Sequence, residues 1–183
     1  MRHIALLRGI NVGGNTMIKM EELRAMFEAL RFGNVKSYIN SGNIAFDSVS
    51  SPHVSKGKTL EIALSNQIES AIQNTFGRSI PVMVREQRQI QTVLENNPFA
   101  GQFESHKEMH VLFLKEEMPA DKLQQLLANQ TNDEGFAVRG REIFCHLKLG
   151  VANSLLGKGF IEKKLKVAYT ARNWRTVERL AVI

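Results

Sequence analysis

The spacing of hydrophobic and polar residues predicts six secondary-structure elements in the first 85 residues. The apolar run HIALL at 3–7 is typical of a buried strand, and Leu23, Met26, Phe27 and Leu30 recur at helical spacing. The same reasoning gives, in order, strand 3–7, helix 20–30, strands 35–40 and 43–48, an exposed loop at 48–58, helix 59–76 and strand 80–84. This order predicts a ferredoxin-like α+β unit, with helices on one face of an antiparallel sheet.

A comparable pattern continues to the end of the chain. The elements expected there are helix 86–97, strand 109–114, helix 121–130 with Leu123, Leu126 and Leu127 turned inward, a hairpin within 135–147, helix 153–165 and a closing helix from about 173. We therefore expect two ferredoxin-like units, 1–85 and 86–183, with the second carrying basic C-terminal helices. The two are expected to pack tightly, either as two small domains or as one.

The two expected hairpins share a spacing of aromatic residues about a glycine. Tyr38, Gly42 and Phe46 in the first correspond to Phe136, Gly140 and Phe144 in the second, each 98 positions later. A constant offset of this kind indicates that the two units arose by internal duplication.

The segment Gly9-Ile-Asn-Val-Gly-Gly-Asn-Thr16 departs at one residue from the phosphate-binding pattern G-x-x-x-x-G-K-[ST], because Asn15 stands where that pattern has lysine. The helical pattern also begins near Met20, too late for the last glycine to lie at a helix N-terminus. These departures disfavour a nucleoside triphosphatase. Arg8, Asn11, Gly13 and Gly14 still suit a loop that binds an anion through backbone N–H groups, although a simple tight turn explains the glycines equally well.

Positive charge is concentrated near the C-terminus. The chain has a formal charge of +6, and residues 158–183 hold seven basic and two acidic side chains, which is +5 of that total. A local basic surface of this kind attracts phosphates or nucleic acid, although charged helix faces are commonly only solvated. Trp174, Val177, Leu180 and Ala181 are expected to face the core, while Arg172, Arg175 and Arg179 form a basic face beside them.

No residue pattern supports a particular enzymatic reaction, a metal centre or a cofactor. His106 and His110 would meet only on a helix, whereas 109–114 has the pattern of a strand. Cys145 and His146 are adjacent on an expected strand and would point to opposite faces, so they cannot act as nucleophile and base. With one cysteine and no long apolar segment, we expect a cytoplasmic protein that does not cross a membrane.

Four segments together carry a family resemblance. They are LLRGINVGGN at the start, SYINSGNIAF in the first hairpin, NNPF before the second unit and TARNWRTVERL at the end. In this order they resemble the bacterial family called domain of unknown function 1697. The resemblance implies a bacterial α+β protein with duplicated ferredoxin-like units and no established activity. Many members look like GGKN where this chain has Gly13-Gly14-Asn15-Thr16, so the lysine is missing here.

Three functions agree with these observations. The first is a non-catalytic protein that binds a phosphate-bearing ligand or nucleic acid through Arg8, Asn11, Gly13, Gly14, Ser41, Asn43, Arg172 and Asn173. The second is an enzyme that acts on a phosphorylated small molecule clamped by Arg8 and Arg172. The third is a scaffold or homo-oligomer, in which the two arginines are buried and Asn11, Asn43 and Asn173 serve as turn and cap residues.

Overall fold

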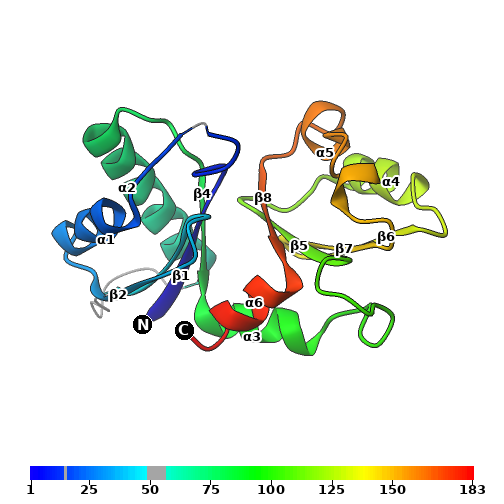
Figure 1. The fold of residues 1–183 in the computed structure, drawn as a ribbon, viewed down its shortest axis with the longest axis horizontal. Helices are drawn as coiled ribbons and strands as arrows, with labels where there is room; N and C mark the ends of the chain where they lie inside the picture. Colours follow the sequence, from blue (N-terminus) through cyan, green and yellow to red (C-terminus); the bar gives the residue numbers. More distant parts are fainter. Residues whose placement is uncertain (15, 49–56) are drawn as a thin grey trace. The chain divides into compact units, whose positions relative to one another are not determined.

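A computed structural model describes residues 1–14, 16–48 and 57–183. Its helices and strands fall into two compact units, which Figure 1 colours by sequence. The first unit comprises Met1–Gln91 and Arg179–Ile183, and the second comprises Thr92–Glu178. Asn15 and most of the loop expected at 48–58 lie outside the described residues. Among the described residues the fold is a mixed α+β arrangement with two four-stranded antiparallel sheets and six α-helices.

The first sheet has the strand order β2-β3-β1-β4. Its strands are β1 (Arg2–Leu7), β2 (Gly33–Tyr38), β3 (Asn43–Asp47) and β4 (Val82–Glu86), and every neighbouring pair is antiparallel. Helix α1 (Met20–Ala29) connects β1 to β2, and α2 (Lys58–Phe76) precedes β4. All six of these elements agree in type and position with the expectation from the hydrophobic pattern.

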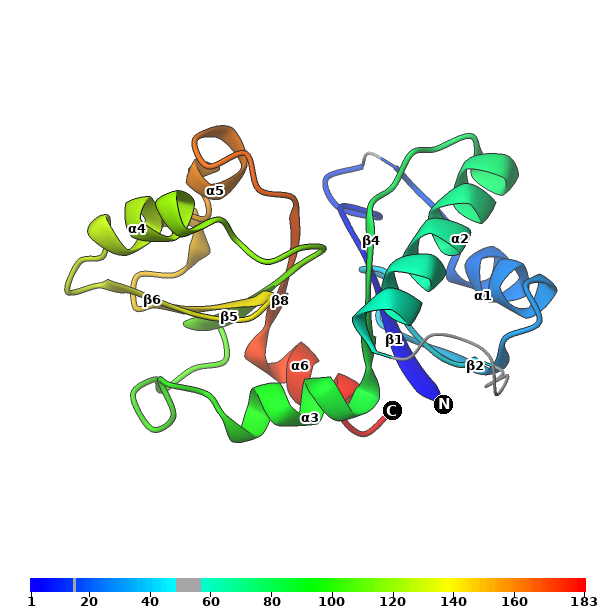
Figure 2. The same ribbon diagram turned by 180° about the vertical axis from the view of Figure 1, so that it is seen from behind.

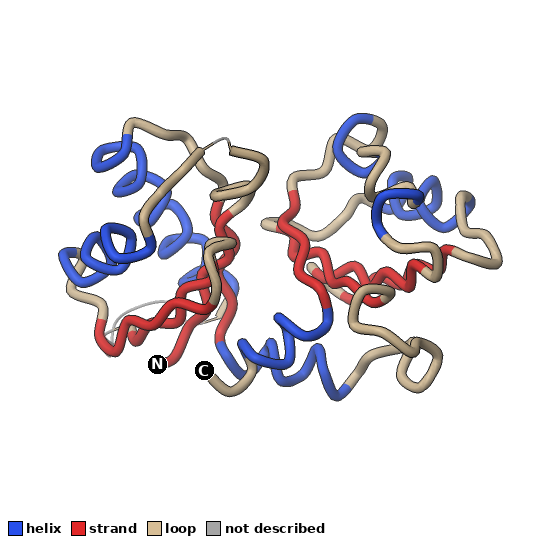
Figure 3. The backbone as a smooth tube through the Cα atoms, viewed as in Figure 1, coloured by secondary structure: helices blue, strands red, loops and turns tan. Residues whose placement is uncertain are grey.

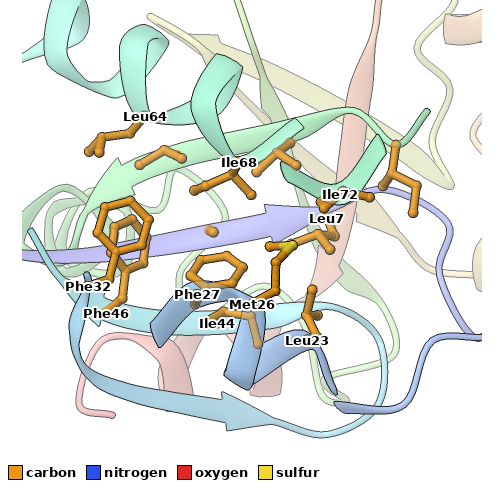
Figure 4. Close-up of a cluster of buried hydrophobic side chains, with 14 of the residues drawn as sticks. Leu7, Leu23, Met26, Phe27, Phe32, Ile44, Phe46, Leu64, Ile68 and Ile72 are labelled. Carbon is orange, nitrogen blue, oxygen red and sulfur yellow. The ribbon is translucent and has the colours of Figure 1, made fainter. Parts of the chain in front are cut away.

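Helices α1 and α2 cover the same face of the first sheet (Figures 2 and 4). The buried apolar side chains of this core come from both helices, from three strands and from the turn before β2: Ala5, Leu7, Leu23, Met26, Phe27, Phe32, Ile44, Phe46, Leu64, Ile68, Ile72, Val82 and Val84. Three of its rings, Phe27, Phe32 and Phe46, pack together with centroid distances of 4.5 to 5.9 Å. Burial of this apolar stripe, more than helix propensity, fixes the helices on the sheet.

Carboxylates of α2 bind the backbone of β4. Glu69 Oε1 accepts a hydrogen bond from Val82 N at 2.9 Å, and Glu61 Oε1 accepts one from Glu86 N at 3.2 Å. Strand β4 is at the edge of its sheet, where backbone N–H groups lack a strand partner. The two glutamates satisfy these donors, which explains why Glu61 is buried on a helix.

The second sheet repeats this order as β6-β7-β5-β8. Strands β5 (Met109–Leu114), β6 (Glu134–Arg139) and β7 (Glu142–Leu147) are the strands expected from the sequence. Strand β8 (Tyr169–Asn173) was not expected, and it pairs antiparallel with β5, so that Val111 lies opposite Arg172. Arg172 therefore belongs to a strand, and the expectation that it shares a helical face with Arg175 and Arg179 is wrong.

The helices of the second unit are shorter than the pattern predicts. Helix α4 (Ala120–Ala128) buries Leu126, whereas Leu127 is exposed, which contradicts its expected inward position. The helix expected at 153–165 is instead a 3-10 turn (Val151–Asn153) followed by turns and the short α5 (Phe160–Lys163), seen in Figure 3 as mostly loop. The glycines at 157 and 159 interrupt this segment, and Gly159 has a positive φ of 73°.

Two further helices follow strands directly. Helix α3 (Gln87–Glu95) continues from β4, and α6 (Trp174–Leu180) continues from β8. The division between the units falls within α3, later than the boundary expected at residue 85.

The last residues belong to the first unit, where Gln87 Nε2 donates to the carbonyls of Leu180 and Ile183, and Gln91 Nε2 donates to that of Ala181. The four apolar residues expected to face inward from the closing helix, Trp174, Val177, Leu180 and Ala181, are all buried.

Candidate ligand-binding site

Asn11 joins the loop after β1 to the first hairpin. Its side-chain Nδ2 donates to the carbonyl of Ile18 at 2.9 Å and to that of Asn40 at 2.8 Å, while Oδ1 accepts from Ile18 N at 2.8 Å. Its own backbone N–H donates to Thr16 O at 3.1 Å. One side chain therefore fixes both the closure of the loop and its contact with the hairpin turn.

The hairpin turn is held by Asn43 and Gly42. Asn43 is fully buried, and its Nδ2 donates to Tyr38 O and to Ser41 Oγ, both at 3.0 Å. Gly42 has a φ of 77°, and a Cβ atom there would lie 2.7 Å from Leu7 Cβ. The turn thus approaches the end of β1 so closely that only glycine fits. This contact brings the hairpin tip against the loop that follows β1.

A pocket of about 650 Å³ lies where the loop, the hairpin tip and the start of α1 meet, and we call it the glycine-loop pocket. The loop contributes Asn11, Met17 and Ile18, the hairpin contributes Asn40, and the helix start contributes residues 19–22. Of the residues selected from the sequence, Asn11 lines this pocket, whereas Arg8, Gly13, Gly14, Ser41 and Asn43 belong to the same loop and hairpin segments but are not among its lining residues.

Strained backbone occurs beside this pocket. Asn11, Thr16 and Ile39 have φ values of 55°, 55° and 48°. Residues other than glycine seldom adopt this left-handed region of backbone conformation. Ile39 is β-branched and 52% exposed, so burial of its side chain does not offset the cost of this conformation. Such strain is often found where a backbone is shaped for a ligand.

Gly13 and Gly14 are exposed and have φ values of 64° and 76°. A Cβ atom at either position would meet nothing within 4 Å, so internal packing does not require glycine there. Val12 and Met17 on the same loop are 63% and 67% exposed. The loop therefore presents apolar side chains as well as the backbone of the exposed glycines.

The charges at the pocket are mixed. Lys19 Nζ lies 3.4 Å from Glu22 Oε1, and both side chains are largely exposed. Glu21 and Glu22 stand in the first turn of α1, where carboxylates interact favourably with the helix dipole. These two carboxylates therefore disfavour an anionic group at the start of this helix.

Arg172 and Asn173 belong to the second unit, and each makes a hydrogen bond to a near neighbour in the chain. Arg172 is 7% exposed, and its Nη1 donates to Thr170 Oγ1 at 2.6 Å and to Ala171 O at 2.8 Å. Burial lowers the pKa of its guanidinium to about 10. Asn173 Oδ1 accepts from Thr176 N at 3.0 Å and so caps α6. Asn11, Asn43 and Asn173 thus all serve as turn or cap residues.

Cys145 and His146 lie on opposite faces of β7, as the sequence predicts. Cys145 is buried in the core of the second unit, whereas His146 beside it contacts Phe99 and Phe103, with centroid distances of 5.6 and 6.4 Å. His106 Nε2 lies 3.0 Å from Glu178 Oε2. Within the described residues no group of three or more His, Cys, Asp or Glu side chains could hold a metal ion.

Sequence reasoning missed the buried polar contact of His3 in the first unit. His3 is fully buried and stacks on Phe46, and its Nδ1 lies 3.2 Å from Met1 O and 3.3 Å from Ser48 Oγ. Ser48 also lines a pocket of about 400 Å³ between the end of α1 and the start of α2. Nothing in the local sequence pairs residues 3 and 48, because their contact depends on strand register.

Comparisons with known proteins give a family and a fold. A family model described as "Protein of unknown function (DUF1697)" matches residues 1–144, and the chain belongs to this family. It is similar to a solved structure, that of conserved bacterial protein SP0830 from Streptococcus pneumoniae, at 25% identity with a TM-score of 0.75. The similarity covers 98% of this chain and 96% of that one. A comparison with curated proteins finds no significant match.

Of the helices in the described part of the chain, none has the length and apolar character to span a membrane.

Proposed function

We propose that the protein is a non-catalytic binding protein that holds a phosphate-bearing small molecule at the glycine-loop pocket. The phosphate lies against the backbone of Gly13 and Gly14, near Arg8, and the rest of the ligand occupies the pocket between the loop and Asn40. The observation that carries the proposal is a pocket of about 650 Å³ bordered by two segments with strained backbone.

The two exposed glycines support the position of the phosphate. Because they lack side chains, a ligand can approach their backbone closely and accept hydrogen bonds from N–H groups. Apolar surface from Met17 and Ile18 in the pocket suits a less polar part of the same ligand. In this proposal Arg172 and Asn173 have structural roles, since Arg172 is buried and Asn173 caps α6, and the ligand is bound by the first unit.

A thermal unfolding panel tests the proposal. Inorganic phosphate, pyrophosphate, nucleotides and phosphorylated sugars would be compared with the same sugars and nucleosides without phosphate. A ligand at a hundred times its Kd stabilises the folded state by about 2.7 kcal/mol, which gives a clear rise in Tm. Stabilisation only by the phosphorylated compounds supports the proposal, and equal stabilisation by both members of each pair contradicts the role of the phosphate.

The chain offers a matched pair of variants for this panel. Gly14 and Gly101 have φ values of 76° and 74°, and a Cβ at either would meet nothing within 4 Å. Gly14→Ala and Gly101→Ala should therefore both lower stability by about 1 kcal/mol through the same backbone strain. Only Gly14→Ala should weaken the ligand-induced rise in Tm. An equal loss in both variants would show that the effect is not specific to the loop.

We also propose that the two units are ferredoxin-like and descend from a duplicated ancestor. This proposal is supported by the strand order, which is β2-β3-β1-β4 in the first unit and β6-β7-β5-β8 in the second, with the same antiparallel pairing. The 98-residue offset is weaker support, since Tyr38 pairs with Asn43 whereas Phe136 pairs with Cys145, so the two hairpins differ in register.

A further inference from the structure

Four exposed lysines lie close together in the sequence, in the connection between β7 and β8. Lys158, Lys163, Lys164 and Lys166 fall within nine residues, and Glu162 is the one acidic residue among them, so this segment carries a net charge of +3. We call residues 158–166 the basic turn. It lies beyond residue 144, where the match to the family model ends.

The basic turn has a defined backbone. Lys163 N donates to Gly159 O at 2.8 Å, and Lys164 N donates to Phe160 O at 2.9 Å. Two apolar residues anchor it, since Ile161 and Leu165 are buried in the core of the second unit. The lysines are therefore held as a group by the fold, and a ligand need not order a flexible segment in order to meet them.

The preceding backbone is packed equally closely. A Cβ atom on Gly157 would lie 2.1 Å from the carbonyl oxygen of Val151, so no other residue fits without movement of the chain. Ser154 Oγ donates to the same carbonyl at 2.6 Å and accepts from Gly157 N at 3.2 Å. These contacts fix the start of the basic turn against the 3-10 turn before it.

We propose that the basic turn binds the phosphate backbone of nucleic acid without reading its sequence. Four clustered ammonium groups match a polymer with regularly spaced negative charges, and such contacts supply most of non-specific affinity. The cluster consists of lysines with no arginine, whereas protein–protein interfaces are depleted in lysine and enriched in arginine. An acidic protein is therefore a less suitable partner.

The direction of the apolar side chains distinguishes nucleic acid from a membrane surface. Membrane-binding segments combine basic residues with apolar side chains that enter the lipid. In the basic turn Ile161 and Leu165 face the protein core and Phe160 packs against it, so these side chains are not available for insertion. The basic turn thus presents charge without an apolar anchor.

Fluorescence anisotropy with a short labelled single-stranded RNA, over a series of salt concentrations, tests this proposal. The variant Lys163→Gln/Lys164→Gln/Lys166→Gln removes three charges from the basic turn. Its control, Lys36→Gln/Arg78→Gln/Lys107→Gln, removes three charges from exposed positions elsewhere. Each lost phosphate contact reduces the slope of log K against log salt by about 0.7, so the first variant should lose about 2 in slope and about tenfold or more in affinity at low salt.

The outcomes separate the alternatives. Loss of RNA affinity in the basic-turn variant, with affinity retained in the control, supports the proposal. An equal loss in both variants would assign the binding to net charge and overturn it, as would no RNA binding by the unmodified protein. Binding to phosphatidylserine vesicles without binding to RNA would also overturn it. Circular dichroism of both variants confirms that each is folded.

Discussion

Asn11 donates a hydrogen bond of 2.8 Å to the carbonyl of Asn40, and this contact joins the loop after β1 to the tip of the first hairpin. The two segments are separated by all of α1 and β2 in the sequence. A pocket lies directly beside the contact, and both residues line it. The side-chain amide of Asn11, together with the close approach of Gly42 to Leu7, therefore sets the position of the proposed site.

The substitution Asn11→Asp should lower the free energy of unfolding by about 2 kcal/mol, because it removes the bonds donated to the carbonyls of Ile18 and Asn40 while it keeps the acceptor for Ile18 N. Urea unfolding measures the change. Asn129→Ala is a suitable control, since its exposed side chain bonds only within its own helix end, and it should change stability by less than about 0.5 kcal/mol. Equal effects of the two substitutions would show that Asn11 does not hold the loop.

Gly42→Ala should destabilise the protein more than Gly140→Ala, although both glycines lie in hairpin turns with positive φ. A Cβ at Gly42 would lie 2.7 Å from Leu7 and 3.0 Å from Ile10, whereas at Gly140 the nearest atom, on Glu142, is 3.9 Å away. We expect about 1 kcal/mol at Gly140 from backbone strain and at least about 1 kcal/mol more at Gly42 from overpacking. Urea unfolding of the two variants gives the comparison, and a smaller effect at Gly42 would contradict the close approach.

Stability should fall as the pH is lowered below 6.5. Burial holds the pKa of His3 and of His110 below their ordinary value of 6.5. The unfolded chain therefore binds more protons than the folded one between 6.5 and the lowered pKa values, so the free energy of unfolding decreases across that window and levels off beneath it. Urea unfolding from neutral pH to about pH 5 measures this, and His110→Phe should reduce the slope. A protein that gains stability on acidification would refute the assignment.

Cys145 should be unreactive in the folded protein. It is fully buried, and burial raises the pKa of its thiol well above the ordinary value, so the reactive thiolate is scarce. A thiol-specific chromogenic reagent at mildly alkaline pH should label the native protein slowly and the urea-unfolded protein rapidly. Similar rates in the two states would mean that the strand around Cys145 is open to solvent.

The hydrophobic pattern predicts seven of the strands and places the helices of the first unit, because those segments combine clear periodicity with turn residues at their ends. Strand β8 is not predicted, because Tyr169–Asn173 (YTARN) has no run of apolar residues. It forms a strand through its pairing with β5. The helix expected at 153–165 fails for a local reason, since Gly157 packs against Val151 and Gly159 takes a left-handed conformation.

The candidate site was only partly accessible from sequence. Asparagine in a glycine-rich loop suggests a turn residue, which is the role Asn11 has, but no local pattern identifies Ile18 and Asn40 as its partners. For Arg172 the sequence allowed either a ligand contact or a buried structural role. Its burial and its bond to Ala171 O follow from the strand that the pattern did not predict.

Amide NMR of the uniformly labelled protein, titrated with the phosphorylated compound that most raises the Tm, tests the proposed site most directly. The account predicts that the resonances of Gly13, Gly14 and Asn40 shift in proportion to occupancy, while those of Gly101 stay in place. Shifts confined to other parts of the chain, or none at the glycines, would contradict a phosphate site in the glycine loop.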